Sequence, residues 1–301
     1  MFFNNMFGEI AMITRINNED EIKNKLNQFP VEFYAYNCST QGLTRKVYFY
    51  PTQQNQNSSI TLSPEQIDLV SQVLDNETLV SYRSDIYTLC DFSLRNDGNV
   101  ENVGFSFKII DDSSYTNPLC VFEQFTNFDV KKFSDVIVRI QKALFYDEPE
   151  FNPVSMIGLL FGRTCLKSIK SYVRFDYSKV RTFSARVGLL KRVITTINPG
   201  STVQNDFLDC AKVIERLGFQ FVFVGIDCDA YGDNRFKLYF RTYDKFEPTI
   251  TAKETRRILD KFNLYSNVDE MFSKSKNGMW GFAISTADFT KVEGIQLYFY
   301  P

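Results

Sequence analysis

The chain has 301 residues, of which 44% are hydrophobic, and its formal net charge is −2. These values fit a folded protein, and the near-neutral charge removes the argument for general binding to nucleic acid or to an anionic membrane. The absence of histidine excludes Ser-His and Cys-His nucleophile pairs as well as His metal ligands.

The cysteines and the chain start bear on the cellular compartment. Six cysteines are scattered without a CxxC pair, which disfavours a zinc site and suits buried thiols in a reducing compartment. The first residues lack the basic and long apolar regions of a signal peptide. No segment reaches the roughly 18 apolar residues of a membrane span. We therefore expect a cytoplasmic protein.

Alternating segments that predict β-strands recur in pairs along the whole chain. The first strands of the five pairs are predicted at Val31–Asn37, Tyr87–Leu94, Met156–Arg163, Phe219–Ile226 and Met279–Thr286. The second strands are predicted at Thr44–Pro51, Gly104–Ile110, Ser168–Phe175, Arg235–Thr242 and Gly294–Pro301. Turn residues separate the strands of a pair, as in Arg95–Gly98 and Tyr231–Asn234. The second strands repeat at intervals of roughly 60 residues.

A helical segment precedes each strand pair. Two of these segments open with capping-box patterns, at Ser63–Gln66 and Thr251–Glu254. The other three show apolar residues at helical spacing, at Glu19–Phe29, Phe133–Phe145 and Asn205–Gly218.

Five helix–hairpin units give ten strands. An open sheet of ten twisted strands would leave two exposed edges, whereas closure removes them. We therefore predict an α+β fold in which residues 1–301 form one domain, a closed ten-stranded antiparallel β-barrel with a polar lumen, ringed by α-helices. The alternative is two packed α+β domains.

The two faces of the second strands differ in character. One face is almost wholly apolar and is expected to lie under the helices. The other face carries a recurring pattern of cations and tyrosines, which we predict to line the barrel interior: Lys46, Tyr48, Tyr50, Ser106, Lys108, Lys170, Tyr172, Arg174, Lys237, Tyr239, Arg241, Gln296, Tyr298 and Tyr300. The alternative is that these residues cover the wet face of a half-exposed sheet.

Several cations inside a closed barrel repel one another unless an anion lies among them. Lysine and arginine suit phosphate oxygens, and no P-loop or GxGxxG motif offers another phosphate cradle. Aromatic rings beside the cations also suit a carbocation. The pattern therefore indicates a diphosphate site with a carbocation shield. The acidic pairs Asp111–Asp112 and Asp227–Asp229 follow predicted strands and are interpreted as turn residues.

The first strand adds an acid. Glu32, Tyr34 and Tyr36 share one face, and we expect that face to line the lumen, where Glu32 could accept a proton from an acceptor or could pair with a lumen lysine. Asp91 is a second candidate of the same type. Tyr34 and Trp280 are assigned to the acceptor side, although core packing is an equally good interpretation of Trp280.

The chain resembles the ABBA, or PT-barrel, prenyltransferases, and among them the cyanobactin peptide prenyltransferases. The resemblance rests on VEFYAY, LCDFSLRND, MIGLLFGR, KSIKSYVRF, LGFQFVFVG, MWGFAIS and IQLYFYP, and on their order from about Val31 to Pro301. It implies a barrel of αββα repeats, a dimethylallyl diphosphate donor with Mg²⁺ bound through the diphosphate, and a ribosomally made, commonly macrocyclic, peptide acceptor.

The resemblance also implies roles for individual residues. The family's catalytic glutamate looks like Glu32, and its first diphosphate cation looks like Lys46, with Arg45 one register away. Its other lumen positions look like Lys170, Tyr172, Arg174, Lys237, Tyr239, Arg241 and Tyr298. Ser106 stands where a lysine is common, and Lys108 on the same face is expected to replace it.

We therefore expect a peptide prenyltransferase that transfers a dimethylallyl or geranyl group. The alternatives are a small-molecule aromatic prenyltransferase of the same fold, a non-catalytic barrel that binds a lipid or an anion, and a structural repeat protein. The expected partners are a prenyl diphosphate and a peptide, without nucleic acid or membrane, and the expected state is a monomer or weak homodimer. The residue type that is modified stays open.

Overall fold

The computed structural model describes residues 33–49, 86–94, 100–109, 128–145, 154–162, 164–174, 180–200, 205–242, 251–264, 267–273 and 278–300. The predicted helices at Glu19–Phe29 and Ser63–Gln66 lie outside these residues, as do the turn at Arg95–Gly98 and Asp111–Asp112.

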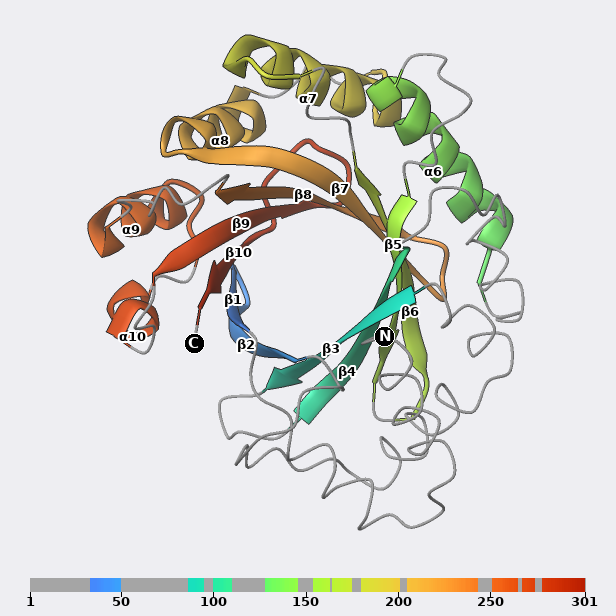
Figure 1. Cartoon of the computed structure of the whole chain (residues 1–301), viewed down its shortest axis with the longest axis horizontal. Coiled ribbons are helices and arrows are strands. Elements are labelled where there is room, and N and C mark those ends of the chain that lie inside the picture. Colours follow the sequence, from blue (N-terminus) through green and yellow to red (C-terminus); the bar gives the residue numbers. More distant parts are fainter. Residues whose placement is uncertain are drawn as a thin grey trace, which may run out of the picture.

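Ten antiparallel strands form a closed barrel (Figure 1). They are β1 (Phe33–Ser39), β2 (Gly42–Phe49), β3 (Ile86–Leu94), β4 (Val100–Ile109), β5 (Val154–Phe161), β6 (Leu166–Arg174), β7 (Phe219–Asp229), β8 (Asn234–Thr242), β9 (Met279–Thr286) and β10 (Gly294–Phe299). Each strand pairs with its neighbours in the sequence, and β1 pairs with β10 to close the ring. The predicted closed barrel is therefore confirmed.

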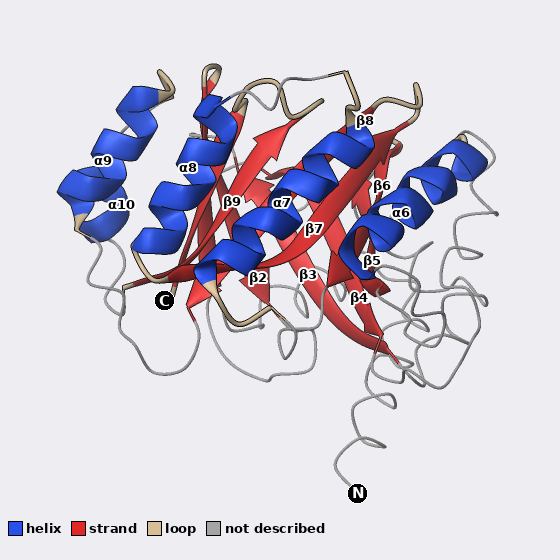
Figure 2. Cartoon of the chain, turned by 90° about the horizontal axis from the view of Figure 1, so that it is seen from above, coloured by secondary structure: helices blue, strands red, loops and turns tan. Residues whose placement is uncertain are grey.

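Helices lie outside the barrel and cover part of its outer wall (Figures 1 and 2). The structure describes α6 (Val130–Phe145), α7 (Phe183–Ile197), α8 (Asn205–Arg216), α9 (Ala252–Lys261) and α10 (Val268–Ser273). The sequence predicted α6, α8 and α9 but not α7 or α10. Of the helices described, none combines the length and the apolar character that crossing a membrane requires.

Local capping fixes the starts of two helices. The predicted capping box at α9 is present: the Thr251 hydroxyl accepts the Glu254 N–H, and the Glu254 carboxylate accepts the Thr251 N–H. Thr182 caps α7 by accepting the Ala185 N–H at 3.2 Å. Helix α7 lacks acidic residues in its first turn, so it carried no capping-box signal in the sequence.

The main hydrophobic core lies between the helices and the outer face of the strands. Helix α7 buries Leu190 and Val193 there, and α8 buries Phe207. The predicted apolar face of the second strands meets them, and its buried members include Val47, Phe105, Ile169, Val173, Phe236, Leu238, Phe240, Ile295, Leu297 and Phe299. Because this face is committed to the helices, the alternate residues of each strand point into the lumen.

Candidate active site

Strand pairing shows which side chains share the inner face. Residues directly opposite one another on neighbouring antiparallel strands project from the same face of the sheet. Lys46 pairs with Ala35 and Ser93, whereas Lys170 pairs with Gly158 and Asp227. Following these pairs around the ring places most of the predicted lumen set on the inner face: Lys46, Tyr48, Ser106, Lys108, Lys170, Tyr172, Arg174, Lys237, Tyr239, Arg241, Gln296 and Tyr298.

Some predicted residues are placed only in part. Lys108 occupies an inner-face position in β4, but its side chain is not among those described. Tyr50 and Glu32 lie outside the described residues. Tyr300 is half exposed beyond the end of β10, with its ring centroid 6.0 Å from that of Trp280.

Three lysines from β2, β6 and β8 lie close enough inside the barrel to perturb one another. Lys46 forms an ion pair with Asp91 of β3, with Nζ 2.9 Å from Oδ1. Lys237 lies 3.5 Å from a carboxylate oxygen of Asp227 in β7. Lys170 is only 4% exposed, and its charge acts on both carboxylates. With Arg235, this group (the lumen charge cluster) holds four cations and two carboxylates.

Burial, together with the charges of neighbouring cations, lowers the pKa values of two of the three lysines. Burial and the charges of Arg235, Lys170 and Lys46 lower the pKa of Lys237 to about 7, against the opposing effect of Asp227. Burial and the Lys46 charge also lower the pKa of Lys170. Because the cations outnumber the two carboxylates, the site favours an anion that carries several charges.

The carboxylates remain ionised, and Lys46 keeps its proton. Burial alone would raise the pKa of Asp91 and of Asp227, but the neighbouring lysine charges outweigh it and hold both pKa values below the usual range. Burial lowers the pKa of Lys46, yet the charge and hydrogen bond of Asp91 leave it above its ordinary value. Two internal ion pairs therefore neutralise only part of the lumen charge cluster.

Four tyrosines form an aromatic belt beside these charges. The belt consists of Tyr48, Tyr172, Tyr239 and Tyr298. Successive ring centroids are 5.8 Å apart for Tyr172 and Tyr239, 6.3 Å for Tyr239 and Tyr298, and 6.2 Å for Tyr298 and Tyr48. Burial raises the pKa of all four hydroxyls, so they are neutral at pH 7. The belt therefore offers ring faces and uncharged hydroxyl groups next to the cations.

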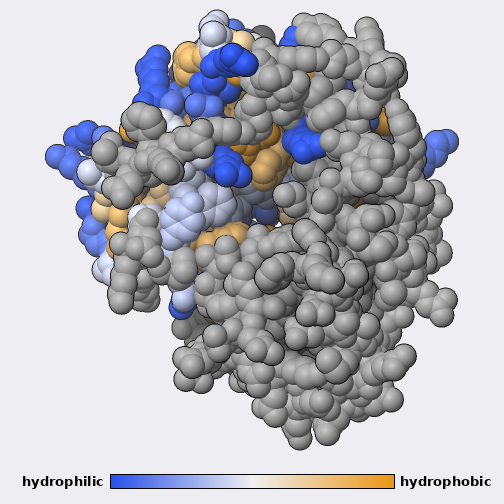
Figure 3. Space-filling model, in the orientation of Figure 1, coloured by the Kyte–Doolittle hydropathy of each residue, from blue (hydrophilic) through white to orange (hydrophobic). Residues whose placement is uncertain are grey.

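Further aromatic rings extend the belt. Phe33 stacks on Tyr48 with ring centroids 4.3 Å apart, and Trp280 lies 5.2 Å from Phe33 and 5.1 Å from Tyr298. On the other side, Phe223 lies 4.5 Å from Tyr239. The Trp280 side chain thus joins the inner aromatic cluster rather than the core under the helices. In the space-filling view, pale blue (weakly hydrophilic) and orange (hydrophobic) residues lie side by side to the left of the centre (Figure 3).

The inner face of β1 is the opposite of the predicted one. Tyr36 is buried in the core under the helices, and Tyr34 packs against that core. The Arg45 guanidinium lies over the Tyr34 ring, with its Cζ atom 4.8 Å from the ring centroid. Phe33 and Ala35 point into the lumen instead. The assignment of Tyr34 to the acceptor side is therefore wrong, whereas Glu32 lies outside the described residues and its role stays a prediction.

The physical reason lies in the space around Ala35. Ala35 is level with Lys46 on one side and Tyr298 on the other, so a small inward side chain leaves room for both. Alternation in the sequence separated the two faces of β1 correctly. It could not show which face was inside, because hydroxyl groups and apolar rings occur on both faces.

Sequence reasoning also missed several lumen residues. Asp227, interpreted as a turn residue, belongs to β7 and pairs with Lys170 and Arg235. The turn residue is Asp229, which accepts the N–H groups of Tyr231 and Asp233. Continuing the alternation of β7 beyond Ile226 would have placed Asp227 inside. Arg235 and Phe223 follow from the same alternation.

The predicted arginines lie away from the centre of the lumen charge cluster. Arg174 is half-buried opposite Phe223, and Arg241 is exposed opposite Gln220 and Gly281. Each is two residues further along its strand than a belt tyrosine. At these positions the two arginines are better placed to contact a ligand that enters the lumen than one bound at its centre.

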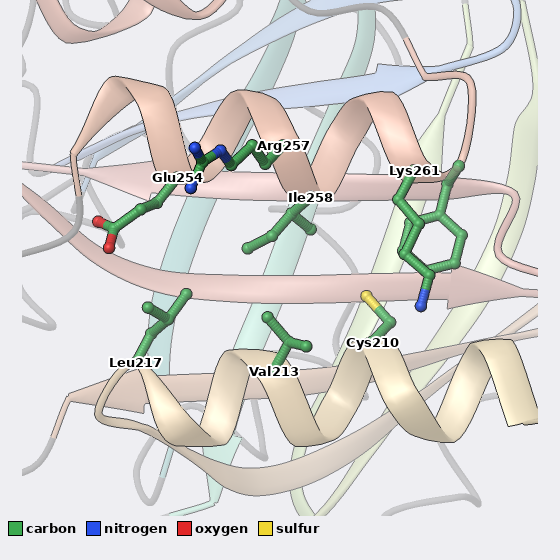
Figure 4. Close-up of a pocket in the computed structure, with 8 residues that line it drawn as sticks. Cys210, Val213, Leu217, Glu254, Arg257, Ile258 and Lys261 are labelled. Carbon is green, nitrogen blue, oxygen red and sulfur yellow. The ribbon is translucent and has the colours of Figure 1, made fainter.

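Metal ligands are not gathered in the described part of the chain, where no three Asp, Glu, Cys or His side chains form a group that could hold an ion. The two lumen carboxylates face lysines. A pocket of about 250 Å³ lies elsewhere, outside the barrel between α8 and α9 (Figure 4). Its lining combines the apolar side chains of Val213, Leu217, Ile258 and Phe262 with three charged residues of α9, which are Glu254, Arg257 and Lys261.

Comparison with known proteins gives a match in structure but not in sequence. No protein family and no curated protein matches the chain. The crystal structure of AnaPT from Neosartorya fischeri is 13% identical, with a TM-score of 0.58 over 89% of this chain and 77% of that one. NotF, crystallised with brevianamide F and DMSPP, is 11% identical, with a TM-score of 0.54 over 89% and 79%.

A third solved structure, a 6-dimethylallyl tryptophan synthase, is 9% identical, with a TM-score of 0.54 over 98% of this chain and 93% of that one. NotF is described as a prenyltransferase. The chain therefore has the closed antiparallel barrel fold of the ABBA prenyltransferases. At these identities the likeness concerns the fold.

Proposed function

We propose that this protein is a prenyltransferase that binds a prenyl diphosphate in the barrel lumen and transfers its dimethylallyl or geranyl group to a side chain of a ribosomally made, commonly macrocyclic, peptide. The observation that carries the proposal is the buried excess of cations beside a belt of four tyrosines. The proposal takes residues 1–301 as one cytoplasmic barrel domain, a monomer or weak homodimer.

The lumen charge cluster suits the leaving group. As the bond between C1 of the donor and its oxygen breaks, negative charge grows on the diphosphate, and the lysines, whose charges are only partly balanced by the two carboxylates, stabilise it. Lys46, Lys170 and Lys237 are the proposed central contacts, with Lys108, Arg174 and Arg241 as further cations. This interaction strengthens as charge develops, which lowers the barrier to bond breaking.

The tyrosine belt suits the prenyl group. An allylic cation gains about 0.5–2 kcal/mol from each aromatic face that it contacts, and the rings exclude water that would capture it. Neutral hydroxyls in the belt can donate to the diphosphate oxygens without adding negative charge near the cation. The acceptor then supplies the electron pair to C1 and loses a proton.

We retain Glu32 as the proposed acceptor of that proton, since the resemblance assigns it this role. Asp91 is a described carboxylate beside the belt, opposite Tyr48. Its ion pair with Lys46 makes it a poorer base than a free carboxylate.

The chain's own residues supply the charge that Mg²⁺ supplies in other diphosphate sites. Asp91 and Asp227 are each engaged by a lysine, so they do not form a metal cage. Mg²⁺ would bind through the diphosphate itself, as the resemblance implies, and no proposed step depends on it.

A small aromatic acceptor is the second candidate. It is favoured by the similarity to NotF crystallised with brevianamide F and to a dimethylallyl tryptophan synthase. The aromatic cluster of Phe33, Trp280 and Tyr298 could stack on an indole as readily as on a peptide side chain.

The test is incubation with C5 and C10 diphosphates and a panel of cyclic peptides, tryptophan and cyclic dipeptides, read by mass shift. A product in the wild type and its loss in Lys170→Ala, with Lys212→Ala on the surface of α8 as the control, supports the proposal. Peptide and indole products decide between the acceptors. Unchanged donor affinity in both Lys170→Ala and Lys237→Ala overturns the diphosphate assignment.

A further inference from the structure

Two carboxylates inside a cationic site need an explanation. An anion-binding lumen would attract a diphosphate more strongly without them, because each aspartate repels the ligand. Yet Asp91 and Asp227 are placed directly against Lys46 and Lys237. They come from β3 and β7, two separate repeats of the barrel, so the arrangement occurs twice.

The backbone makes specific room for one of them. Asp91 lies over Gly104 of β4, where an added Cβ would come within 2.0 Å of its carboxylate oxygen. The carboxylate is therefore packed between the β4 backbone and the Lys46 ammonium, 2.9 Å away. Asp227 is held by its place in β7, between Lys170 of β6 and Arg235 of β8.

We propose that Asp91 and Asp227 are resident counter-anions, positioning residues that raise the protonated fraction of the lumen lysines while no diphosphate is bound and whose place beside the lysines the diphosphate takes when it enters. This inference rests on the proposed diphosphate site but not on which acceptor is used, or on turnover. The carboxylates act through the lysines and need not touch the reacting atoms.

The argument for Asp227 follows from the groups that face Lys237. Arg235 on its own strand, Lys170 of β6 and Lys46 of β2 all disfavour its charged form, as does burial. Asp227 is the main group that favours it. Without that carboxylate, Lys237 would be neutral in the empty barrel, and binding of a diphosphate would then require uptake of a proton.

The argument for Asp91 is parallel. Lys46 faces Asp91, Tyr172 and Tyr298, and Asp91 supplies both the charge and the hydrogen bond that outweigh burial. Asp91 also acts on Lys170, which lies between the two ion pairs. The two aspartates together therefore support all three lysines. A site whose lysines are held largely charged in this way needs to take up fewer protons when the diphosphate binds.

The test measures proton uptake when inorganic diphosphate binds to the full-length protein. Titration calorimetry at pH 7 and 8, in buffers with different ionisation enthalpies, gives the number of protons bound with the ligand. The ionisation of diphosphate itself is common to all variants and cancels when they are compared. In the wild type, the pKa of Lys237 predicts an uptake by this residue of about half a proton at pH 7.

Asp227→Asn and Asp91→Asn are expected to take up more protons than the wild type, and their affinity is expected to fall more steeply with pH, by up to about tenfold more per pH unit for each further proton. Asp209→Asn is the matched control, because Asp209 forms an Asp–Lys pair of the same 2.9 Å length that is exposed on α8. It is expected to behave like the wild type. Uptake equal to the wild type in both lumen variants overturns the inference.

A second variant covers the case in which the asparagine variants do not fold. Lys237→Arg keeps the charge but cannot release its proton at these pH values, so it should lose the half-proton uptake of the wild type at pH 7. Undiminished uptake in this variant also overturns the inference. If diphosphate binds with the expected proton uptake but no acceptor is prenylated, the proposed function fails while the counter-anion role stands.

Discussion

A single methyl group added at Gly225 should disturb the tyrosine belt without touching the lysines. Gly225 lies in β7 on the inner face, between Tyr172 and Lys237 of the neighbouring strands. A Cβ there would lie 2.8 Å from Cε2 of Tyr239 and 3.5 Å from two ring carbons of Tyr172. Ordinary contacts begin near 3.4 Å, so the Tyr239 ring must withdraw by at least 0.6 Å (3.4 − 2.8).

The ring has little space into which to withdraw. Phe223 lies 4.5 Å from the Tyr239 ring centroid on one side, and Tyr298 lies 6.3 Å away on another. Overpacking of this kind costs about 1–3 kcal/mol of folding free energy. We expect Gly225→Ala to lower the free energy of unfolding by that amount and to raise the ratio of donor hydrolysis to acceptor prenylation, because the displaced ring shields the cation less well.

The assay combines chemical denaturation, calorimetry with inorganic diphosphate and separate measurement of the hydrolysis and transfer products. The affinity for diphosphate should change by less than about threefold, which is ~0.7 kcal/mol, because the nearest contacts of the added methyl group are tyrosine rings. Gly188→Ala on α7 is the control, because nothing lies within 4 Å of an added Cβ and alanine favours a helix by about 1 kcal/mol. Wild-type stability and product ratio in Gly225→Ala would refute the packing argument.

Three further predictions follow from the described contacts. The Glu215 carboxylate accepts hydrogen bonds from the Arg186 guanidinium at 2.8 and 3.0 Å and from the Phe221 N–H at 2.7 Å, so Glu215→Leu should cost about 3–5 kcal/mol in urea unfolding, and adding Arg186→Met should recover part of it. The pKa of Lys237 falls from its usual 10.5 to about 7 on folding, so the unfolded chain binds more protons between these pH values. The free energy of unfolding without ligand should therefore rise with pH by up to about 1.4 kcal/mol per unit from pH 7 to 9. Lys237→Met should remove that slope, and an unchanged slope would contradict the prediction. Chelation by EDTA should leave diphosphate affinity within about threefold of its value with Mg²⁺, whereas complete loss would show that the cations are insufficient.

The sequence by itself determined the strands and the ring they form. Alternation located all ten strands to within a few residues, and the two edges that an open ten-stranded sheet would expose predicted closure, which β10 and β1 provide by pairing. It also identified the inner face of the second strands, because their other face is almost wholly apolar and has to be buried. The Thr251 capping box followed from local chemistry alone.

The tertiary structure decided which groups meet inside the barrel. Alternation assigns a residue to one of two faces, but only the packing of neighbouring strands shows which face of β1 is inside, and there it placed Phe33 and Ala35 rather than Tyr34. The charge balance of the lumen was equally hidden, since Asp91 and Lys46 are 45 residues apart and become partners only when β2 and β3 pair. A pKa depends on distances and burial, and sequence spacing across separate strands specifies neither.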